Sequence, residues 1–227
     1  AEYRGKHKQK VKGFSTNITE TLPEKDKPSL ITDVKVKGAT AADNDFFEDA
    51  VTATREVTGD DVKTAYVDGA YQSQSNRDFA KDEEMNIVAG GLQGKPSRFD
   101  LNMTDAQTLE VTDKTTGEVK TAIPVKPDKW KIDLVDANGK KAYRYFSKEQ
   151  VDRVEVRRKV DAIPFDERKK RNNVEAAMFQ YSFHTRNNKT RYRTLIKHSL
   201  QAIARCAWIN MRRIFWFDCK LSLQMAK

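Results

Sequence analysis

The chain has 227 residues, a formal net charge of +9 and a hydrophobic fraction of 38%. It can therefore form one large globular domain or two small ones, with a heavily solvated surface. No apolar run approaches the roughly 20 residues that span a bilayer, and the N-terminus lacks the apolar core of a signal peptide, so we expect a cytoplasmic protein. Cys206 and Cys219 form no metal-binding or disulfide pattern and are predicted to be free thiols on a helix.

The positive charge is concentrated in the C-terminal third of the chain. Residues 151–227 contain 18 Lys and Arg against 7 Asp and Glu, whereas the preceding residues are slightly acidic. The basic residues alternate with aromatic and amide side chains, among them Tyr192 and Trp208. This pattern favours a nucleic acid over a membrane as the polyanionic partner, although a solvated basic face would look the same.

The N-terminal part begins with two strand-like runs. Residues 13–20 and 29–37 alternate partly in hydrophobicity and are joined by a turn-rich segment, so they predict an antiparallel pair. Residues 43–57 then predict an amphipathic helix, with Asp43 as its N-cap and Gly59 at its end.

The next elements predict an α/β order. Residues 62–67 resemble a short strand that ends at Asp68. A polar-faced helix over residues 75–84 and a buried strand over residues 86–89 follow.

The remainder is predicted to form two further parts. Short β-like runs separated by Gly and Pro turns predict a β-rich insertion at residues 93–150, in which Asn138-Gly139 is the strongest hairpin signal. Residues 151–227 are predicted to be mostly helical, with a break at Pro164. On the last helix one apolar stripe is predicted to be core; its members are Leu195, Ile196, Leu200, Ile203, Ala207, Trp208 and Met211.

One carboxylate stands out in the helical part. Val174, Met178, Phe179 and Tyr181 predict a buried stripe, and Glu175 lies at its edge. A Glu near a helix start has an ordinary structural role, because it interacts favourably with the helix dipole. The second interpretation is that its carboxylate belongs to a functional site.

Two blocks of sequence together resemble a known enzyme family. The first is an apolar strand ending in Asp68-Gly-Ala-Tyr71, followed by a helix with Asn76-Arg77. The second is Arg171-x-x-x-Glu175 on a helix, running into Asn188-Lys-Thr-Arg-Tyr-Arg193. Their order and separation resemble the DDE transposases of bacterial insertion sequences, and the resemblance covers most of residues 3–214.

The resemblance implies an RNase H-like α/β fold with a mixed sheet, flanking helices and the β-rich insertion. Residues 1–92 would form the first part of the core, residues 93–150 the insertion, and residues 151–227 the helical remainder with a basic DNA-binding face. Asp68 and Glu175 would be the second and third catalytic acids and ligands of Mg²⁺ or Mn²⁺, since converging carboxylates hold two ions roughly 4 Å apart.

The implied activity is metal-dependent cleavage and transfer of DNA strands at transposon ends, by a homodimer or higher oligomer. The resemblance places the first catalytic Asp on a strand before residue 13, so we expect a fragment that is inactive alone; Asp33 is a weak substitute. The implied DNA contacts are Arg171, Lys189, Arg191, Arg193, Lys197 and Arg205. The alternatives are a non-catalytic DNA-binding module, in which Asp68 is a turn residue and Glu175 a helix charge, and a structural protein with a solvated basic face.

Overall fold

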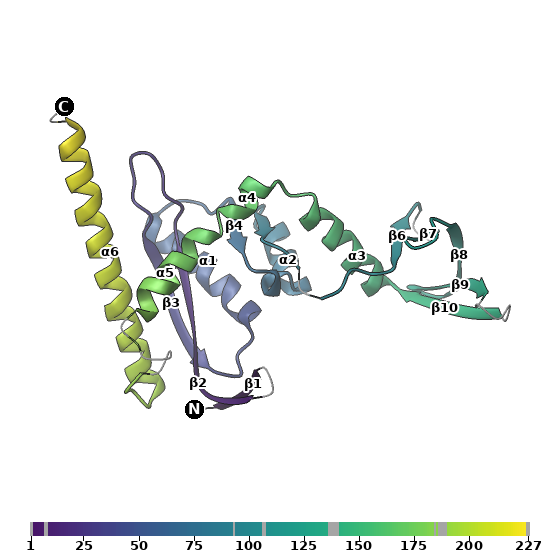
Figure 1. Cartoon of the computed structure of the whole chain (residues 1–227), viewed down its shortest axis with the longest axis horizontal. Coiled ribbons are helices and arrows are strands. Elements are labelled where there is room, and N and C mark those ends of the chain that lie inside the picture. The colour runs from purple at the N-terminus through teal and green to yellow at the C-terminus, as the bar shows by residue number, and fades with distance from the viewer. Residues whose placement is uncertain are drawn as a thin grey trace. The chain divides into compact units, whose positions relative to one another are not determined.

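The computed structural model divides into two compact units (Figure 1). Unit 1 comprises Ala1–Gly90 and Phe165–Lys227, and unit 2 comprises Gly91–Pro164. The structure describes residues 2–6, 9–92, 94–105, 108–135, 141–183, 185 and 190–225.

An antiparallel sheet begins unit 1. It consists of β1 (Glu2–Lys6), β2 (Gln9–Glu20) and β3 (Ile31–Gly38), in that order. β1 pairs with the first residues of β2, and β3 pairs with the rest of β2. The predicted antiparallel pair is therefore confirmed, with a longer first strand.

The helix predicted at residues 43–57 is also present. It starts as a short 3₁₀ helix, η1 (Asp43–Phe46), and continues as α1 (Phe47–Thr58). Gly59 ends it with a positive φ of 71°, a conformation that glycine adopts without steric cost. The predicted N-cap is wrong, because Ala42 occupies that position and its N–H donates to the Asp45 carboxylate.

A separate two-stranded parallel sheet follows. It is formed by β4 (Thr64–Val67) and β5 (Asn86–Ala89). The connection between them contains the short 3₁₀ helix η2 (Gly69–Tyr71) and α2 (Gln74–Asp82). Parallel strands need such a crossover, and all the elements predicted here are observed.

Three helices complete unit 1: α4 (Phe165–Lys169), α5 (Asn172–Ser182) and α6 (Leu195–Met225). α6 lies along β3 (Figure 1). The Asn210 side chain fixes this contact, because it both accepts from the Ile31 N–H and donates to the Ile31 carbonyl at 2.8 Å.

The predicted apolar stripe of α6 does not face the core. The helix buries Ala202, Cys206 and Ile209 instead, together with Ile18, Ile31 and Ala177. Small side chains allow the helix to approach the sheet closely, so its bulkier apolar residues are left on the other faces. The exposed members of the predicted stripe are Leu195, Ile196, Leu200, Ile203, Ala207, Trp208 and Met211.

The predicted stripe of α5 is wrong in part for the same reason. Only Ala177 is fully buried, while Phe179 is 65% exposed and Met178 is exposed as well. Val174 and Tyr181 are half-buried. Close packing against β2 and α6 is again made through the small residue.

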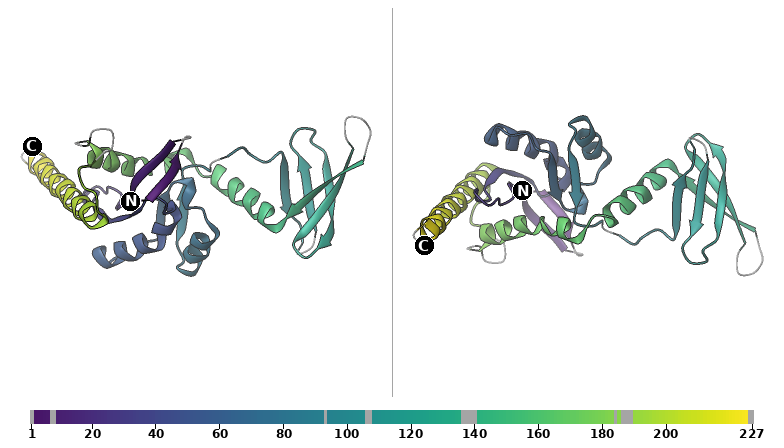
Figure 2. Two further views of the ribbon diagram at one scale, coloured as in Figure 1. Left: turned by 90° about the horizontal axis from the view of Figure 1, so that it is seen from below. Right: turned by 90° about the horizontal axis from the view of Figure 1, so that it is seen from above.

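Unit 2 is a five-stranded antiparallel sheet with one helix (Figure 2). α3 (Lys148–Asp161) contacts both edge strands, and its Val151 belongs to the apolar core of the sheet. The predicted β-rich insertion is thus observed, but the unit extends to Pro164 and includes this helix. The predicted turn at Asn138-Gly139 lies outside the described residues. The strands are β6 (Phe99–Met103), β7 (Leu109–Asp113), β8 (Val119–Lys126), β9 (Lys129–Val135) and β10 (Lys141–Ser147).

The fold is therefore mixed α/β with open sheets. Among the helices of the described residues, none combines the length and the apolar character that a bilayer crossing requires. Cys206 and Cys219 are free thiols on α6, as predicted.

Candidate active site

Asp68 directly follows the carboxyl end of β4. Its carboxylate accepts the Gly69 N–H at 2.6 Å and caps η2, and its side chain is exposed. The carboxyl ends of strands in open α/β sheets are where ligands usually bind. The position is consistent both with a turn-capping Asp and with a ligand at the strand end.

The loop after Asp68 is held by polar side chains from α2. Asn76 is buried, and its amide donates to the carbonyls of Tyr71 (3.0 Å) and Asn44 (3.3 Å). Arg77 donates to the Gln72 carbonyl at 2.7 Å. The Asn76-Arg77 pair, which was part of the family resemblance, thus has a clear structural role in shaping this loop.

Tyr71 connects the loop to the other sheet. Its hydroxyl donates to Asn17 Oδ1 on β2 at 2.6 Å. Burial, and after it the negative charges of Asp43 and Asp68, raise the pKa of Tyr71 to about 12. The hydroxyl therefore keeps its proton and stays a donor at neutral pH.

Glu175 is in the first turn of α5 and forms an ion pair with Arg171, at 2.5 Å between Oε1 and Nη2. The Glu175 side chain is 57% exposed and that of Arg171 26%. Arg171 also lies against Gly90, where a Cβ would come within 2.9 Å of its Nε. The Gly90 N–H in turn donates to the Val67 carbonyl. Arg171 therefore lies at the carboxyl end of β5, the strand that pairs with β4.

A groove of about 600 Å³ connects these features. One wall is the outer edge of β2, from Thr16 onward, and the other is β4 with Asp68 at its end. Arg171, which precedes α5, and Val174 and Met178 of that helix line it, together with Phe47 and Val51 of α1. Asp68 and Arg171 thus share a cavity, although they are far apart in the sequence.

A second polar cluster lies beside the groove on α4. Glu167 accepts from the Tyr66 hydroxyl at 2.9 Å and pairs with Lys170 at 2.7 Å. The hydrogen bonds from Lys170 and then from Tyr66 lower the pKa of Glu167. This cluster was not predicted from the sequence, although the i, i+3 spacing of Glu167 and Lys170 was a usable signal.

The carboxylates do not form a complete metal site. No group of three or more His, Cys, Asp or Glu side chains able to hold an ion occurs in the part of the chain that the structure describes. Asp68 and Glu175 supply hard oxygen ligands, but two carboxylates are too few to hold two ions. The donor set of the described residues therefore does not fit the two-metal centre that the resemblance implies.

The predicted DNA contacts differ in their surroundings. Arg191, Arg193 and Lys197 are exposed at the start of α6, whereas Lys189 lies outside the described residues. Arg205 donates to the carbonyls of Tyr181 (3.2 Å) and Gln180 (3.1 Å), so its guanidinium satisfies the C-terminal end of α5.

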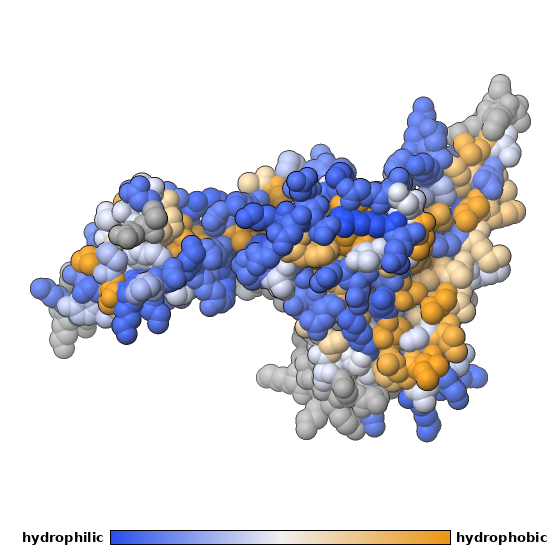
Figure 3. All heavy atoms as spheres, turned by 180° about the vertical axis from the view of Figure 1, so that it is seen from behind, coloured by the Kyte–Doolittle hydropathy of each residue, from blue (hydrophilic) through white to orange (hydrophobic). Residues whose placement is uncertain are grey.

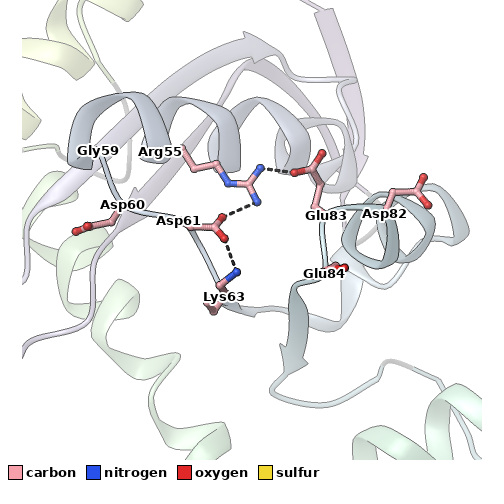
Figure 4. A pocket seen from close by; sticks show the side chains of 8 residues that line it. All are labelled: Arg55, Gly59, Asp60, Asp61, Lys63, Asp82, Glu83 and Glu84. Atoms are coloured by element: carbon pink, nitrogen blue, oxygen red, sulfur yellow. Dashed lines mark hydrogen bonds and ion pairs between the residues drawn. The ribbon is translucent and has the colours of Figure 1, made fainter.

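A second hollow, of about 480 Å³, lies at the opposite ends of β4 and β5 (Figure 4). Arg55 bridges Glu83 and Asp61 there, and Lys63 pairs with Asp61. Figure 4 shows these charges directed at one another, so the carboxylates of the network already have cationic partners.

Comparison with protein-family models, with curated proteins and with solved structures gave no match. The functional assignment therefore depends on the residues and their arrangement.

Proposed function

We propose that the chain is the catalytic core of a DDE-type DNA transposase with an RNase H-like fold, and that Asp68 and Glu175 are two of its metal ligands. The substrate would be DNA at transposon ends, cleaved and joined by metal-assisted phosphoryl transfer. The alternative that the site favours next is a non-catalytic DNA-binding module.

The observation that supports the proposal is that Asp68 and Arg171, one from each sequence block, line the same groove. Asp68 lies at the end of β4, and Arg171, paired with Glu175, lies against Gly90 at the end of β5. The two strands are neighbours. Arg171 thus links the helix that carries Glu175 to the pair of strands that ends at Asp68.

The groove suggests where a third ligand would come from. β4 pairs only with β5, and residues Phe14–Glu20 of β2 pair only with β3, within the described residues. Two-stranded sheets are marginally stable alone, and parallel ones are normally buried. We therefore expect a further strand to lie between β2 and β4, joining the two sheets and carrying an acid beside Asp68. A pair of Mg²⁺ or Mn²⁺ ions would bind only with that strand in place, whereas Asp68 and Glu175 alone would hold a single ion.

The test uses any sequence encoded upstream of Ala1, added to the present chain and assayed for Mg²⁺-dependent nicking of duplex DNA. Nicking should appear in the extended protein and be lost in Asp68→Asn and in Glu175→Gln, with DNA binding preserved. The control is Asp78→Asn, an exposed carboxylate of α2. Nicking that persists in either active-site variant would contradict the assignment.

A specific observation favours the alternative. The Asp68 carboxylate caps η2 and the Glu175 carboxylate pairs with Arg171, so each has a structural partner without metal. In a DNA-binding module the exposed Arg191, Arg193 and Lys197 would carry the function. The extended protein would then bind DNA without cutting it, and the acid substitutions would leave binding unchanged.

A further inference from the structure

The face of α6 that points away from β3 is apolar and exposed (Figure 3). Trp208 is 55% exposed and Met211 is 62% exposed. Exposed apolar patches of more than a few hundred Å² usually mark an interaction surface. The exposed large apolar residues of the helix are Leu195, Ile196, Leu200, Ile203, Trp208, Met211, Ile214, Phe215, Trp216 and Leu223.

The pattern of this face is regular. Lys197, Ala204, Met211 and Asp218 follow one another at intervals of seven residues and therefore lie along one line of the helix. All four are exposed. Leu200, Ala207 and Ile214 alternate with them at spacings of three and four, which is the repeat of a helix that packs along another helix. The line is about 32 Å long at 1.5 Å per residue.

The two ends of the line carry opposite charges. Lys197 is at the N-terminal end and Asp218 at the C-terminal end. Within the described residues neither side chain has an ion-pair partner. An antiparallel pair of α6 helices brings Lys197 of each copy to Asp218 of the other, whereas a parallel pair places like charges together.

Side-chain size agrees with the same register. We take an antiparallel pair whose two-fold axis passes between Ala207 and Trp208. Each residue of one helix then faces the residue of the second copy that lies at the same distance from the axis on the other side. Ala204 then faces Met211 of the second copy, Ala207 faces Trp208, and Leu200 faces Phe215. In the two pairs that contain an alanine, a small residue faces a large one, which fills the space between the helices without a clash. Leu200 and Phe215 form an apolar pair of two large side chains.

We infer that two copies of the chain associate through this face of α6 as an antiparallel, two-fold symmetric helix pair. Such an isologous contact uses one surface twice, so each matched pair occurs twice in the dimer. The inference does not depend on the catalytic assignment, because neither Asp68 nor Glu175 is part of the contact; of the predicted DNA contacts it includes Lys197.

Sedimentation velocity of the whole chain over a range of concentrations tests the contact. The native chain should dimerise, and Met211→Glu should be monomeric because a charge would be buried at the centre. Leu223→Glu is the control, since this exposed residue of α6 lies off the contact line.

A charge exchange tests the direction and register. Lys197→Asp and Asp218→Lys should each weaken the dimer roughly tenfold, since two symmetry-related pairs become repulsive. The double variant should restore it. Three results would overturn the inference: a monomeric native chain, a dimer unaffected by Met211→Glu, or no recovery in the double variant. A monomer that instead binds vesicles of phosphatidylcholine and phosphatidylglycerol would assign the face to lipid.

Discussion

At the scale of single residues, the candidate site depends on side chains that hold Asp68 in place. Asn76 is the clearest of these, because it is buried and its amide donates to two backbone carbonyls on either side of the loop. Buried polar groups of this kind are costly to leave without partners.

Asn76→Ala should therefore destabilise unit 1 by about 1–3 kcal/mol, because two carbonyls lose their donor. Urea unfolding measures the change. Lys81→Ala, at an exposed position on the same helix, should change stability by no more than about 0.5 kcal/mol. Equal effects of the two substitutions would show that the Asn76 contacts do not stabilise the loop.

Asp113 gives a pH-dependent prediction for unit 2. Hydrogen bonds from the Arg98 guanidinium, and next from the Thr115 N–H, lower the pKa of Asp113 to about 2. A carboxyl group whose pKa is lower in the folded state than in the unfolded state stabilises the fold at pH values above its unfolded-state pKa. This stabilisation is lost as the pH falls through the folded-state pKa.

The stability of unit 2 should therefore decrease as the pH falls from about 4 to about 2. Arg98→Ala should flatten this dependence, whereas Lys95→Ala should not. Hydrogen exchange of the β6 and β7 amides reports on this unit alone. An unchanged pH profile in Arg98→Ala would rule out the ion pair as its source.

At the scale of elements, the sequence predicted strands and helices better than it predicted their buried faces. Alternation and turn residues placed β2 to β5 within a few residues, since these signals are local. The face of α6 was wrong because hydrophobicity alone assigned Trp208 and Met211 to the core, whereas the packing against β3 selects small residues such as Ala202 and Cys206.

The core face of α6 can be tested directly. Ile209→Ala should cost about 2–5 kcal/mol, because it leaves a cavity against β3. Leu223→Ala removes a side chain that is 70% exposed and should cost no more than about 0.5 kcal/mol. Chemical denaturation measures both. The reverse ranking would contradict the assignment of Ile209 to the core face of α6.

The candidate site shows the same division between local and long-range information. Asp68 and Glu175 could be selected from the sequence by their motifs. The contact of Arg171 with Gly90 could not be predicted, because the whole of unit 2 separates these two residues in the sequence. The Tyr66–Glu167 hydrogen bond was missed for the same reason.

At the scale of the whole molecule, the excess of positive charge predicts a DNA-binding surface near the start of α6. Arg191→Ala/Arg193→Ala should reduce the slope of log K against log salt by about 1.8, since each phosphate contact contributes about 0.9. Lys126→Ala/Lys129→Ala in unit 2 removes the same charge from exposed positions. Fluorescence anisotropy with duplex DNA measures the slopes. If both double variants change the slope equally, the basic residues near α6 do not form a specific DNA-binding surface, and the positive charge is only a solvated basic face.

The proposed function requires that Asp68 and Glu175 bind one divalent ion between them. Fe²⁺ can replace Mg²⁺ at such sites, and with ascorbate and peroxide it cuts the polypeptide next to where it binds. Mapping the cuts by mass spectrometry therefore locates the ion without requiring DNA cleavage. The acidic network around Asp61 and Glu83 serves as an internal comparison.

We expect cuts near both Asp68 and Glu175, and we expect excess Mg²⁺ to suppress them. Glu175→Gln should abolish the cuts near Asp68 as well, because the two carboxylates share the ion. Cuts confined to one of the two segments, cuts centred on Asp61 and Glu83, or cuts near Asp68 that persist in Glu175→Gln would contradict it.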